Sequence, residues 1–210
     1  MNHLDEIFRD HPQPAAFARA YLDYVIRVIG AIDVNEIAAF ARVLLDARER
    51  DARIYFIGNG GSAATASHFA NDVAIGCRSW QKPFRAMSLT DNVSILTAVG
   101  NDYGYEEIFV VQLKTLMQRG DVVVAISASG NSPNVLKAVE YANANGAITV
   151  ALTGFDGGKL RRLAQSAVHV PTSKGEYGPV EDIHMVFDHL IGAFLMHVCA
   201  AEPARTLSAI

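Results

Sequence analysis

Apolar residues are arranged along this chain in two alternating patterns, short continuous runs and longer stretches with helical spacing. The short runs are bounded by turn-forming residues and predict buried strands. These runs cover residues 53–57, 84–88, 121–126, 147–153 and 167–170. The longer stretches predict helices over 15–29, 34–48, 62–76, 105–118, 132–145 and 180–200, with shorter turns at 92–99 and 158–164. Strands that alternate with helices predict an α/β fold of three layers, with a parallel five-stranded sheet between helices.

A glycine-rich turn follows the first predicted strand. Residues 58–62 read Gly-Asn-Gly-Gly-Ser and lead into a helix-forming stretch. Glycine allows a positive φ and a close approach of the backbone to a ligand, and the first N–H groups of a helix attract anions. We therefore predict that Asn59, Gly60, Gly61 and Ser62 bind a phosphate group.

A second turn of this kind follows the predicted strand at 121–126. It contains Ser127, Ser129 and Ser132, whose hydroxyl groups donate hydrogen bonds without adding a cation, which suits a sugar phosphate better than a triphosphate. Neither turn has the Gly-Lys-Ser/Thr of a nucleoside-triphosphate loop, and the first is a poor match to the dinucleotide fingerprint. Either turn alone could be a tight loop with a capping serine. Both together favour a phosphorylated small molecule as ligand.

Histidine and carboxylate side chains recur on two of the predicted helices. His68 and Asp72 are four residues apart and share a helix face. Glu181 and His189 stand roughly 80° apart around the last helix, so both can face one cavity. Such pairs bind divalent metals or transfer protons. From spacing alone, an ordinary surface pair and an acidic helix start are the favoured explanation of the same residues.

Composition limits the class of protein and its partners. The chain has 210 residues, 50% hydrophobic and 19% charged, which predicts one domain with a sizeable core. The net charge of −4 and the lack of a basic stripe argue against direct binding of nucleic acid. Cys77 and Cys199 lack metal or redox spacing and predict a reducing, cytoplasmic setting. The apolar stretch near 183–201 contains His184 and Asp188, so we expect no membrane span.

Five segments together resemble a known family. They read GNGGSAATASHFA, AVGNDYGYEEIF, GDVVVAISASGNSPNVLKA, VALTGFDGGKL and VEDIHMVFDHL. They look like the SIS (sugar isomerase) family, and within it the phosphoheptose isomerases, from about residue 20 to residue 200. The resemblance implies one SIS domain over residues 1–210 with a flavodoxin-like sheet and long terminal helices. Its expected parts are N-terminal helices at about 4–48, an αβ core at about 53–171 and a C-terminal helix at about 180–200.

The resemblance also implies an activity. Phosphoheptose isomerases interconvert sedoheptulose 7-phosphate and D-glycero-D-manno-heptose 7-phosphate, an aldose–ketose isomerisation through a cis-enediol. The family's phosphate-binding serines match Ser62, Ser127, Ser129 and Ser132. A family zinc ligand matches His68, a C-terminal ligand and acid/base matches His189, and the acid of the Gly-Asn-Asp motif matches Asp102. The family implies zinc as cofactor and a homotetramer with shared active sites.

Three positions depart from the family pattern. Asn71-Asp72 replaces a catalytic and zinc-binding glutamate, Glu181 replaces a glutamine, and Ala128 replaces a threonine. Asp72 is shorter than glutamate by one methylene, and Glu181 restores a long carboxylate. Our hypothesis is that the two changes compensate.

The hypothesis assigns the chemistry to two overlapping sets of residues. The predicted metal ligands are His68, Asp72, Glu181 and His189, and the predicted catalytic residues are Glu181, His189 and Asp72. Two other interpretations stay open. One is a non-catalytic SIS protein, either a sugar-phosphate sensor or a scaffold of the replication-initiation type. The other is an isomerase of a different sugar phosphate.

Overall fold

The fold is built on a central parallel sheet. In the computed structural model, residues 2–201 are described. The strands are β1 (Arg53–Gly58), β2 (Arg85–Ser88), β3 (Val122–Ser127), β4 (Ile148–Thr153) and β5 (Ser166–His169). All pairs are parallel, and the order across the sheet is β2-β1-β3-β4-β5. This flavodoxin-like order reverses direction between β1 and β3, which is where ligands bind in such folds. The predicted parallel five-stranded sheet is confirmed.

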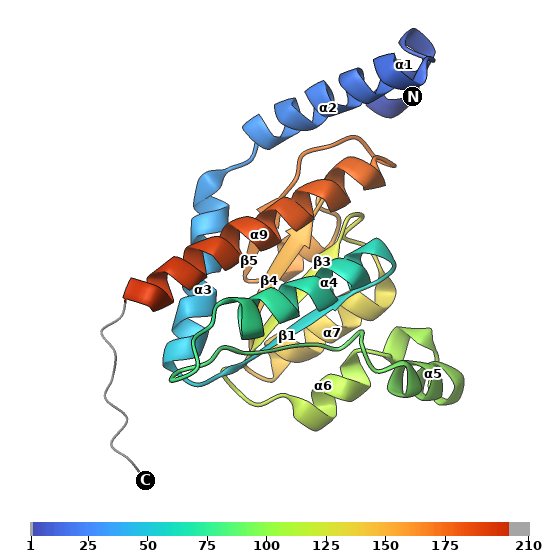
Figure 1. The fold of residues 1–210 in the computed structure, drawn as a ribbon. Coiled ribbons are helices and arrows are strands. Elements are labelled where there is room, and N and C mark those ends of the chain that lie inside the picture. Colours follow the sequence, from blue (N-terminus) through green and yellow to red (C-terminus); the bar gives the residue numbers. More distant parts are fainter. Residues whose placement is uncertain (1, 202–210) are drawn as a thin grey trace.

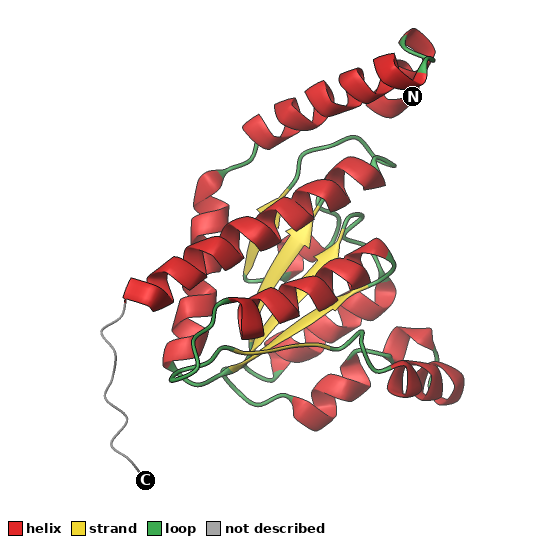
Figure 2. Ribbon diagram, in the orientation of Figure 1, coloured by secondary structure: helices red, strands yellow, loops and turns green. Residues whose placement is uncertain are grey.

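Helices cover both faces of the sheet (Figure 2). One face carries α3 (Val34–Glu49), α4 (Gly61–Asn71) and α9 (Tyr177–Ala201), together with the π-helical turn η1 (Asp72–Gly76). The other face carries α5 (Val93–Asp102), α6 (Val110–Leu116), α7 (Pro133–Ala144) and α8 (Leu160–Leu163), with the 3-10 turn η2 (Tyr105–Glu107) beside them. Figure 1 shows α4 and α9 side by side, running in the same direction across the sheet.

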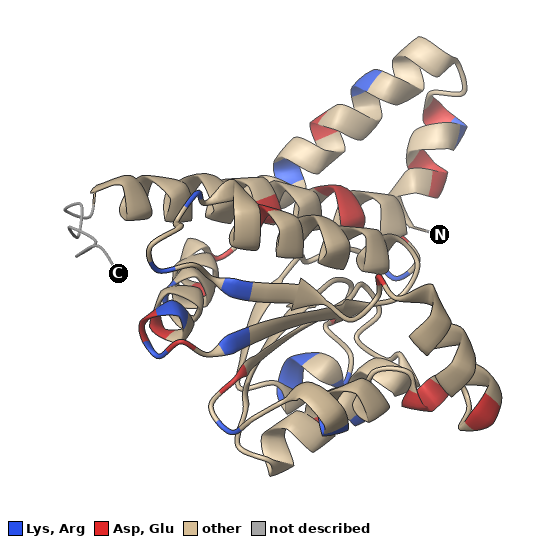
Figure 3. Ribbon diagram, turned by 60° about the horizontal axis from the view of Figure 1, so that its bottom comes forward, with Lys and Arg blue, Asp and Glu red and all other residues tan. Residues whose placement is uncertain are grey.

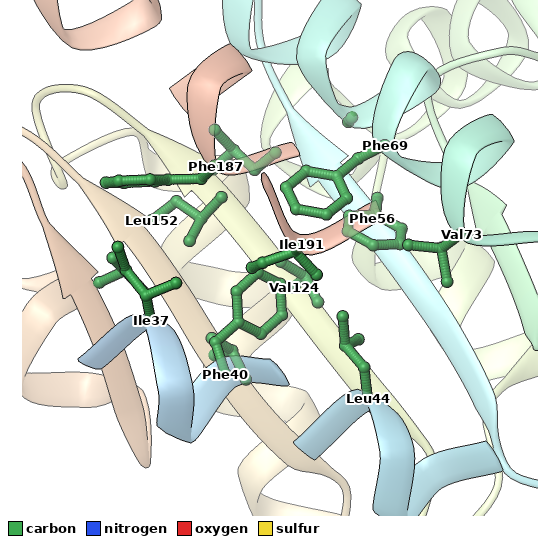
Figure 4. Close-up of a cluster of buried hydrophobic side chains, with 14 of the residues drawn as sticks. Ile37, Phe40, Leu44, Phe56, Phe69, Val73, Val124, Leu152, Phe187 and Ile191 are labelled. Atoms are coloured by element: carbon green, nitrogen blue, oxygen red, sulfur yellow. The ribbon is translucent and has the colours of Figure 1, made fainter. Parts of the chain in front are cut away.

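Residues of β1 alternate between the two cores. Ile54 and Phe56 contribute to the core under α3, α4 and α9, whereas Tyr55 and Ile57 contribute to the opposite one. All four are fully buried, as expected for a strand covered on both faces. Phe56 stacks on Phe69 of α4 with ring centroids 5.0 Å apart, and Figure 4 shows the surrounding residues of α3 and α9. This packing fixes α4, which carries the first glycine-rich turn at its start.

The two N-terminal helices project from the domain (Figure 1). They are α1 (His3–Asp10), which lies in the expected N-terminal helical part at about 4–48 but outside the individual helix ranges predicted, and α2 (Pro14–Gly30). Their main polar attachment is Glu176, just before α9, whose side chain is fully buried. Its carboxylate accepts hydrogen bonds from the backbone N–H of His3 at 2.7 Å and of Ser173 at 2.9 Å, and also from the Tyr24 hydroxyl. These hydrogen bonds therefore attach the helical hairpin formed by α1 and α2 to the segment that leads into α9.

Three predicted elements differ in detail. The turn expected at 92–99 is the helix α5, because the Asn92 side chain caps it by accepting from the backbone N–H of Ile95. The helix expected at 105–118 is divided into η2 and α6. The helix expected at 62–76 changes to π geometry at Asp72, whose carbonyl accepts from the Cys77 N–H five residues on. Turns of this kind are frequent at functional sites.

Helix α9 is long and apolar enough to cross a membrane, by length and composition alone. One side of it is buried in the core, through residues such as Ile183, Phe187 and Ile191. Two of its ionisable residues, His184 and Asp188, are buried on the same side. This arrangement is typical of a core helix in a globular protein.

Candidate active site

The two predicted phosphate turns lie next to each other, because β1 and β3 are neighbours and both turns follow their carboxyl ends. A pair of amide side chains joins them. Asn59 and Asn134 each donate to the other's side-chain oxygen at 2.9 Å. The Tyr105 hydroxyl also donates to Asn59, at 2.9 Å. The turns therefore form one connected surface at the reversal point of the sheet.

The first turn opens α4 with its backbone exposed to a ligand. Gly60 has a φ of +56°, a conformation that favours glycine, and no side chain caps the helix after it. Ser62 is almost completely buried in the first turn of α4. The uncapped N–H groups at this helix start are free to bind an anion.

The second turn gathers hydroxyl groups at the start of α7. The hydroxyl oxygens of Ser127 and Ser132 lie 3.3 Å apart. Ser132 occupies the capping position of α7, yet its side chain makes no capping hydrogen bond. The Ser129 hydroxyl accepts from the backbone N–H of Asn131 at 3.3 Å. The uncapped helix start and the paired hydroxyls suit a phosphate group.

Helices α4 and α9 pack in a regular register that aligns three pairs of residues. A β-carbon added to Gly61 would lie 2.2 Å from Oε2 of Glu181, so the Glu181 carboxylate lies against the start of α4. One heptad further, His68 Nδ1 lies 2.5 Å from Asp188 Oδ2. Gly192 faces the β-carbon of Asp72. Seven residues advance a helix by about 10 Å and return nearly to the same face, so Glu181 and Asp188 lie on one stripe of α9.

A compact group of imidazoles and carboxylates forms around the second of these pairs, His68 and Asp188. One ligand atom from each of His68, Asp72, Asp188 and His189 lies within 4.8 Å of the others. The rings of His68 and His189 meet edge to face with centroids 5.2 Å apart, and His68 Nδ1 is 3.9 Å from Asp72 Oδ2. Imidazole nitrogens and carboxylate oxygens are among the ligands that zinc uses in proteins.

Burial changes the protonation of several groups near this site. Desolvation raises the pKa of Glu181, and the charge of Asp182 adds to the effect. Desolvation also raises the pKa of Asp188, which the hydrogen bond with His68 partly offsets, and the same hydrogen bond raises the pKa of His68. Burial lowers the pKa of His184 to about 4, so this ring is neutral at neutral pH.

Comparisons with known proteins decide the family. The family model of the SIS domain matches residues 20–154. A curated phosphoheptose isomerase of Geobacter metallireducens is 41% identical over 155 residues, which are 74% of this chain and 81% of that relative. The chain belongs to the phosphoheptose isomerase family of SIS-domain proteins.

Other phosphoheptose isomerases match more of the chain. The protein of Aquifex aeolicus is 34% identical over 192 residues, which are 91% of this chain and 93% of that relative. The solved structure of the phosphoheptose isomerase from Neisseria gonorrhoeae has a TM-score of 0.77 and 34% identity, and the match covers 85% of this chain and 96% of that chain. The resemblance to this family predicted from the sequence motifs is confirmed.

In this phosphoheptose isomerase family member, the structure brings together three of the four predicted metal ligands. His68, Asp72 and His189 lie in the group, but the fourth member there is Asp188. The Glu181 carboxylate lies instead against Gly61, beside the first phosphate turn. Asp102 is exposed at the end of α5, where its carboxylate accepts from the Asn101 side chain.

Two residues of the site were not predicted from the sequence. Asn134 joins the phosphate turns, and Asp188 contacts His68. A carboxylate in the otherwise apolar part of α9 is itself a signal, because buried carboxylates almost always have a partner. The amide of Asn134 has no comparable signal, since asparagine is common after a capping serine and proline.

Proposed function

We propose that this chain is an aldose–ketose isomerase that converts sedoheptulose 7-phosphate to D-glycero-D-manno-heptose 7-phosphate. Membership of the phosphoheptose isomerase family supports this substrate class. One structural observation carries the proposal for this chain. The register of α4 and α9 aligns a phosphate turn with a carboxylate at Glu181 and, one heptad on, with a group of imidazoles and carboxylates.

The phosphate turns would hold the non-reacting end of the sugar. Hydroxyl groups of Ser62, Ser127 and Ser132, the uncapped N–H groups of α4 and the backbone N–H of Asn134 in α7 would supply the donors. Ser129, Asn59, Gly60 and Gly61 belong to the same turns. Binding energy from the remote phosphate orients the reacting carbons and so contributes to turnover as well as to affinity.

The isomerisation moves one proton between carbons and one between oxygens. We assign the first transfer to Glu181, which would remove a proton from C1 of the ketose and return it to C2 of the cis-enediol. His189 would transfer the proton from the C1 hydroxyl to the C2 oxygen, since an imidazole can both accept and donate a proton. Burial raises the pKa of Glu181, which makes its carboxylate a stronger base.

The residues around His68 suit a divalent metal, for which zinc is our proposal. The donors are two imidazoles and two carboxylates, and Asp188 Oδ1 is buried with no hydrogen-bond partner among residues 2–201. His68, Asp72 and His189 would hold the ion. Glu181 remains a predicted further ligand that would have to turn away from Gly61. A bound zinc ion would supply Lewis-acid polarisation of the sugar carbonyl.

We also propose that the protein assembles with further copies of itself, as the predicted homotetramer. An apolar groove of about 330 Å³ lies between α3 and α9 and is lined by residues that include Val34, Leu45, Leu190 and Phe194. Leu22 and Ile26 expose further apolar surface on α2. Figure 3 shows how few charged residues α9 carries along its length. A second copy of this chain, with the same apolar helices, is the partner that best fits this surface.

A cytoplasmic location fits the cysteines. Cys77 and Cys199 are both free thiols, and Cys77 is buried. Thiols of this kind persist in reducing compartments. The location stays a prediction, which fractionation of expressing cells would test.

The first experiment is to incubate the purified protein with sedoheptulose 7-phosphate, with and without added zinc, and to follow the aldose by NMR. The proposal expects turnover that is lost in His189→Ala. Sugar-phosphate binding without turnover would instead favour a sensor. Turnover of a different ketose phosphate alone would keep the isomerase and change its substrate.

A further inference from the structure

Asp188 is the most unusual residue of the site. Its side chain is completely buried on α9, between the core residues Phe187 and Ile191. Burying a carboxylate is costly unless a partner compensates it. One oxygen, Oδ2, contacts His68, whereas Oδ1 has no hydrogen-bond partner among the described residues. A carboxylate that is buried despite the free-energy cost of desolvation, and that contacts a proposed metal ligand, is expected to have a role in the site.

The distance between His68 and Asp188 distinguishes a hydrogen bond from a pair of ligands on one metal ion. Two ligands of one tetrahedral zinc ion, each about 2.0–2.2 Å from the metal, are roughly 3.4 Å apart. Nδ1 of His68 and Oδ2 of Asp188 are only 2.5 Å apart, which is a hydrogen bond. An ionised Asp188 can only accept this hydrogen bond, so His68 would then carry its proton on Nδ1, and Nε2 would be the ring nitrogen available to a metal.

Asp72 cannot supply the same hydrogen bond. Its nearest oxygen is 3.9 Å from Nδ1 of His68, which is beyond hydrogen-bond range. The ring of His68 is also 44% exposed, so packing alone does not hold it. Asp188 is thus the one residue among those described here that fixes the orientation of the ring through a hydrogen bond.

We propose that Asp188 is a positioning residue, which holds His68 with Nδ1–H directed at its own carboxylate and Nε2 presented to a divalent cation. The inference rests on the metal site of the proposed function. Carboxylates that accept from a ligating histidine fix its tautomer and raise its basicity, and their loss typically weakens metal affinity 10- to 100-fold. Asp188 acts through His68 and need not touch the substrate.

The first test compares zinc affinity with stability in the full-length protein. Zinc dissociation constants are measured by competition with a chromophoric chelator for wild type, Asp188→Ala, Asp188→Asn and Leu195→Ala. Leu195 is a fully buried residue of the same helix and serves as the packing control. We expect Asp188→Ala to weaken zinc binding roughly 10- to 100-fold. The zinc affinity of Asp188→Asn should lie between those of Asp188→Ala and wild type, because its amide oxygen still accepts from Nδ1–H of His68.

The thermal midpoints of the metal-free proteins separate positioning from a general structural role. Leu195→Ala is expected to lower the midpoint without changing zinc affinity. Asp188→Asn is expected to keep or raise the midpoint, since it removes a buried charge, while it weakens zinc binding. Equal zinc affinity in wild type and Asp188→Ala overturns the proposal, as does a loss of affinity that Leu195→Ala reproduces.

A second readout observes the tautomer directly. Long-range ¹H–¹⁵N spectra of the zinc-loaded protein, with His68 assigned by comparison with His68→Gln, should show a protonated Nδ1 and a metal-bound Nε2. A metal-bound Nδ1 overturns the proposal.

Failure of this inference can be told apart from failure of the proposed function. A wild-type protein that isomerises the sugar phosphate without binding zinc keeps the function and overturns the role of Asp188. Zinc binding that depends on Asp188, in a protein without turnover, supports the role of Asp188 and removes the function.

Discussion

The carboxylate of Glu181 lies directly against the backbone of Gly61, so close that any side chain at position 61 would occupy the place of its oxygens. A β-carbon there would lie 2.2 Å from Oε2 and 2.4 Å from the carboxyl carbon. The atoms that must yield are the end of a flexible side chain. Gly61→Ala is therefore expected to leave the fold intact and to displace Glu181. We predict a fall in kcat on the order of tenfold or more, measured by the NMR isomerase assay.

A double variant connects this loss to Glu181. If Gly61→Ala acts only by displacing the carboxylate, then adding it to Glu181→Gln should cause little further loss. Gly30→Ala is the matched control, because a β-carbon at Gly30 meets no atom within 4 Å. Fully additive losses in the double variant would mean that Gly61 serves the site in another way, such as backbone contact with the phosphate.

Glu181→Gln tests the proposed base. The substitution keeps the size of the side chain and removes the basic oxygen. General base catalysis contributes about 10²- to 10⁴-fold, so kcat should fall by at least about 10²-fold, while binding of the sugar phosphate, measured by calorimetry, changes little. Asp182→Asn is the control, because Asp182 accepts from the Tyr21 hydroxyl of α2 and its charge is the smaller cause of the raised pKa of Glu181, so kcat should fall far less than in Glu181→Gln. Near wild-type activity in Glu181→Gln would rule out Glu181 as the base.

The serine turn should contribute mainly through the phosphate. Ser127→Ala and Ser132→Ala each remove one hydroxyl donor to a dianion, worth about 1.5–3 kcal/mol, or roughly 10- to 100-fold in kcat/KM. Inhibition by inorganic phosphate should weaken in parallel. Ser166→Ala removes a buried hydroxyl at the first residue of the edge strand β5, away from the carboxyl ends of β1 and β3, and should leave kcat/KM unchanged. An unchanged kcat/KM in both turn variants would contradict a phosphate site here.

The layered fold could be predicted from the sequence because its signals are local. The three central strands β1, β3 and β4 are short apolar runs, and residues 122–126 are buried on both faces as such a run requires. The group around His68 could be predicted only in part. Its buried partner Asp188 lies 120 residues away, and their contact depends on the register between α4 and α9. Spacing on α9 alone indicates which residues share a face, but it does not say which of Glu181 and Asp188 lies beside His68.

The apolar groove predicts how assembly can be disrupted. Phe194 lines the groove and is 48% exposed, so Phe194→Asp would place a charge in the proposed contact between copies. Sedimentation velocity should show the proposed wild-type tetramer replaced by smaller species, because an unpaired buried charge is strongly unfavourable. Leu116→Asp, at an exposed apolar residue on α6, should keep the tetramer. An unchanged tetramer in Phe194→Asp would exclude this groove as the interface.

The buried Glu176 predicts a pH-dependent attachment of the N-terminal helices. Burial would raise its pKa, but hydrogen bonds from the Tyr24 hydroxyl and the N–H groups of His3 and Ser173 outweigh this and lower the pKa below 4.5. A depressed folded pKa stabilises the protein above the unfolded value, and that stability is lost as pH falls through the folded pKa. At neutral pH, Glu176→Gln should lower the free energy of unfolding by about 1.5–3 kcal/mol.

Urea denaturation at fixed protein concentration, repeated from pH 7 to pH 3, measures this difference. The difference in free energy of unfolding between wild type and Glu176→Gln should be full at neutral pH. It should shrink as the pH falls below about 4.5 and vanish once Glu176 is protonated in the folded protein, at its lowered pKa. The exposed Glu6 of α1 provides the control, since Glu6→Gln should follow wild type throughout. A gap that is constant across this range would mean that Glu176 acts through packing and not through its charge, and that the hairpin is not held by an ionised carboxylate.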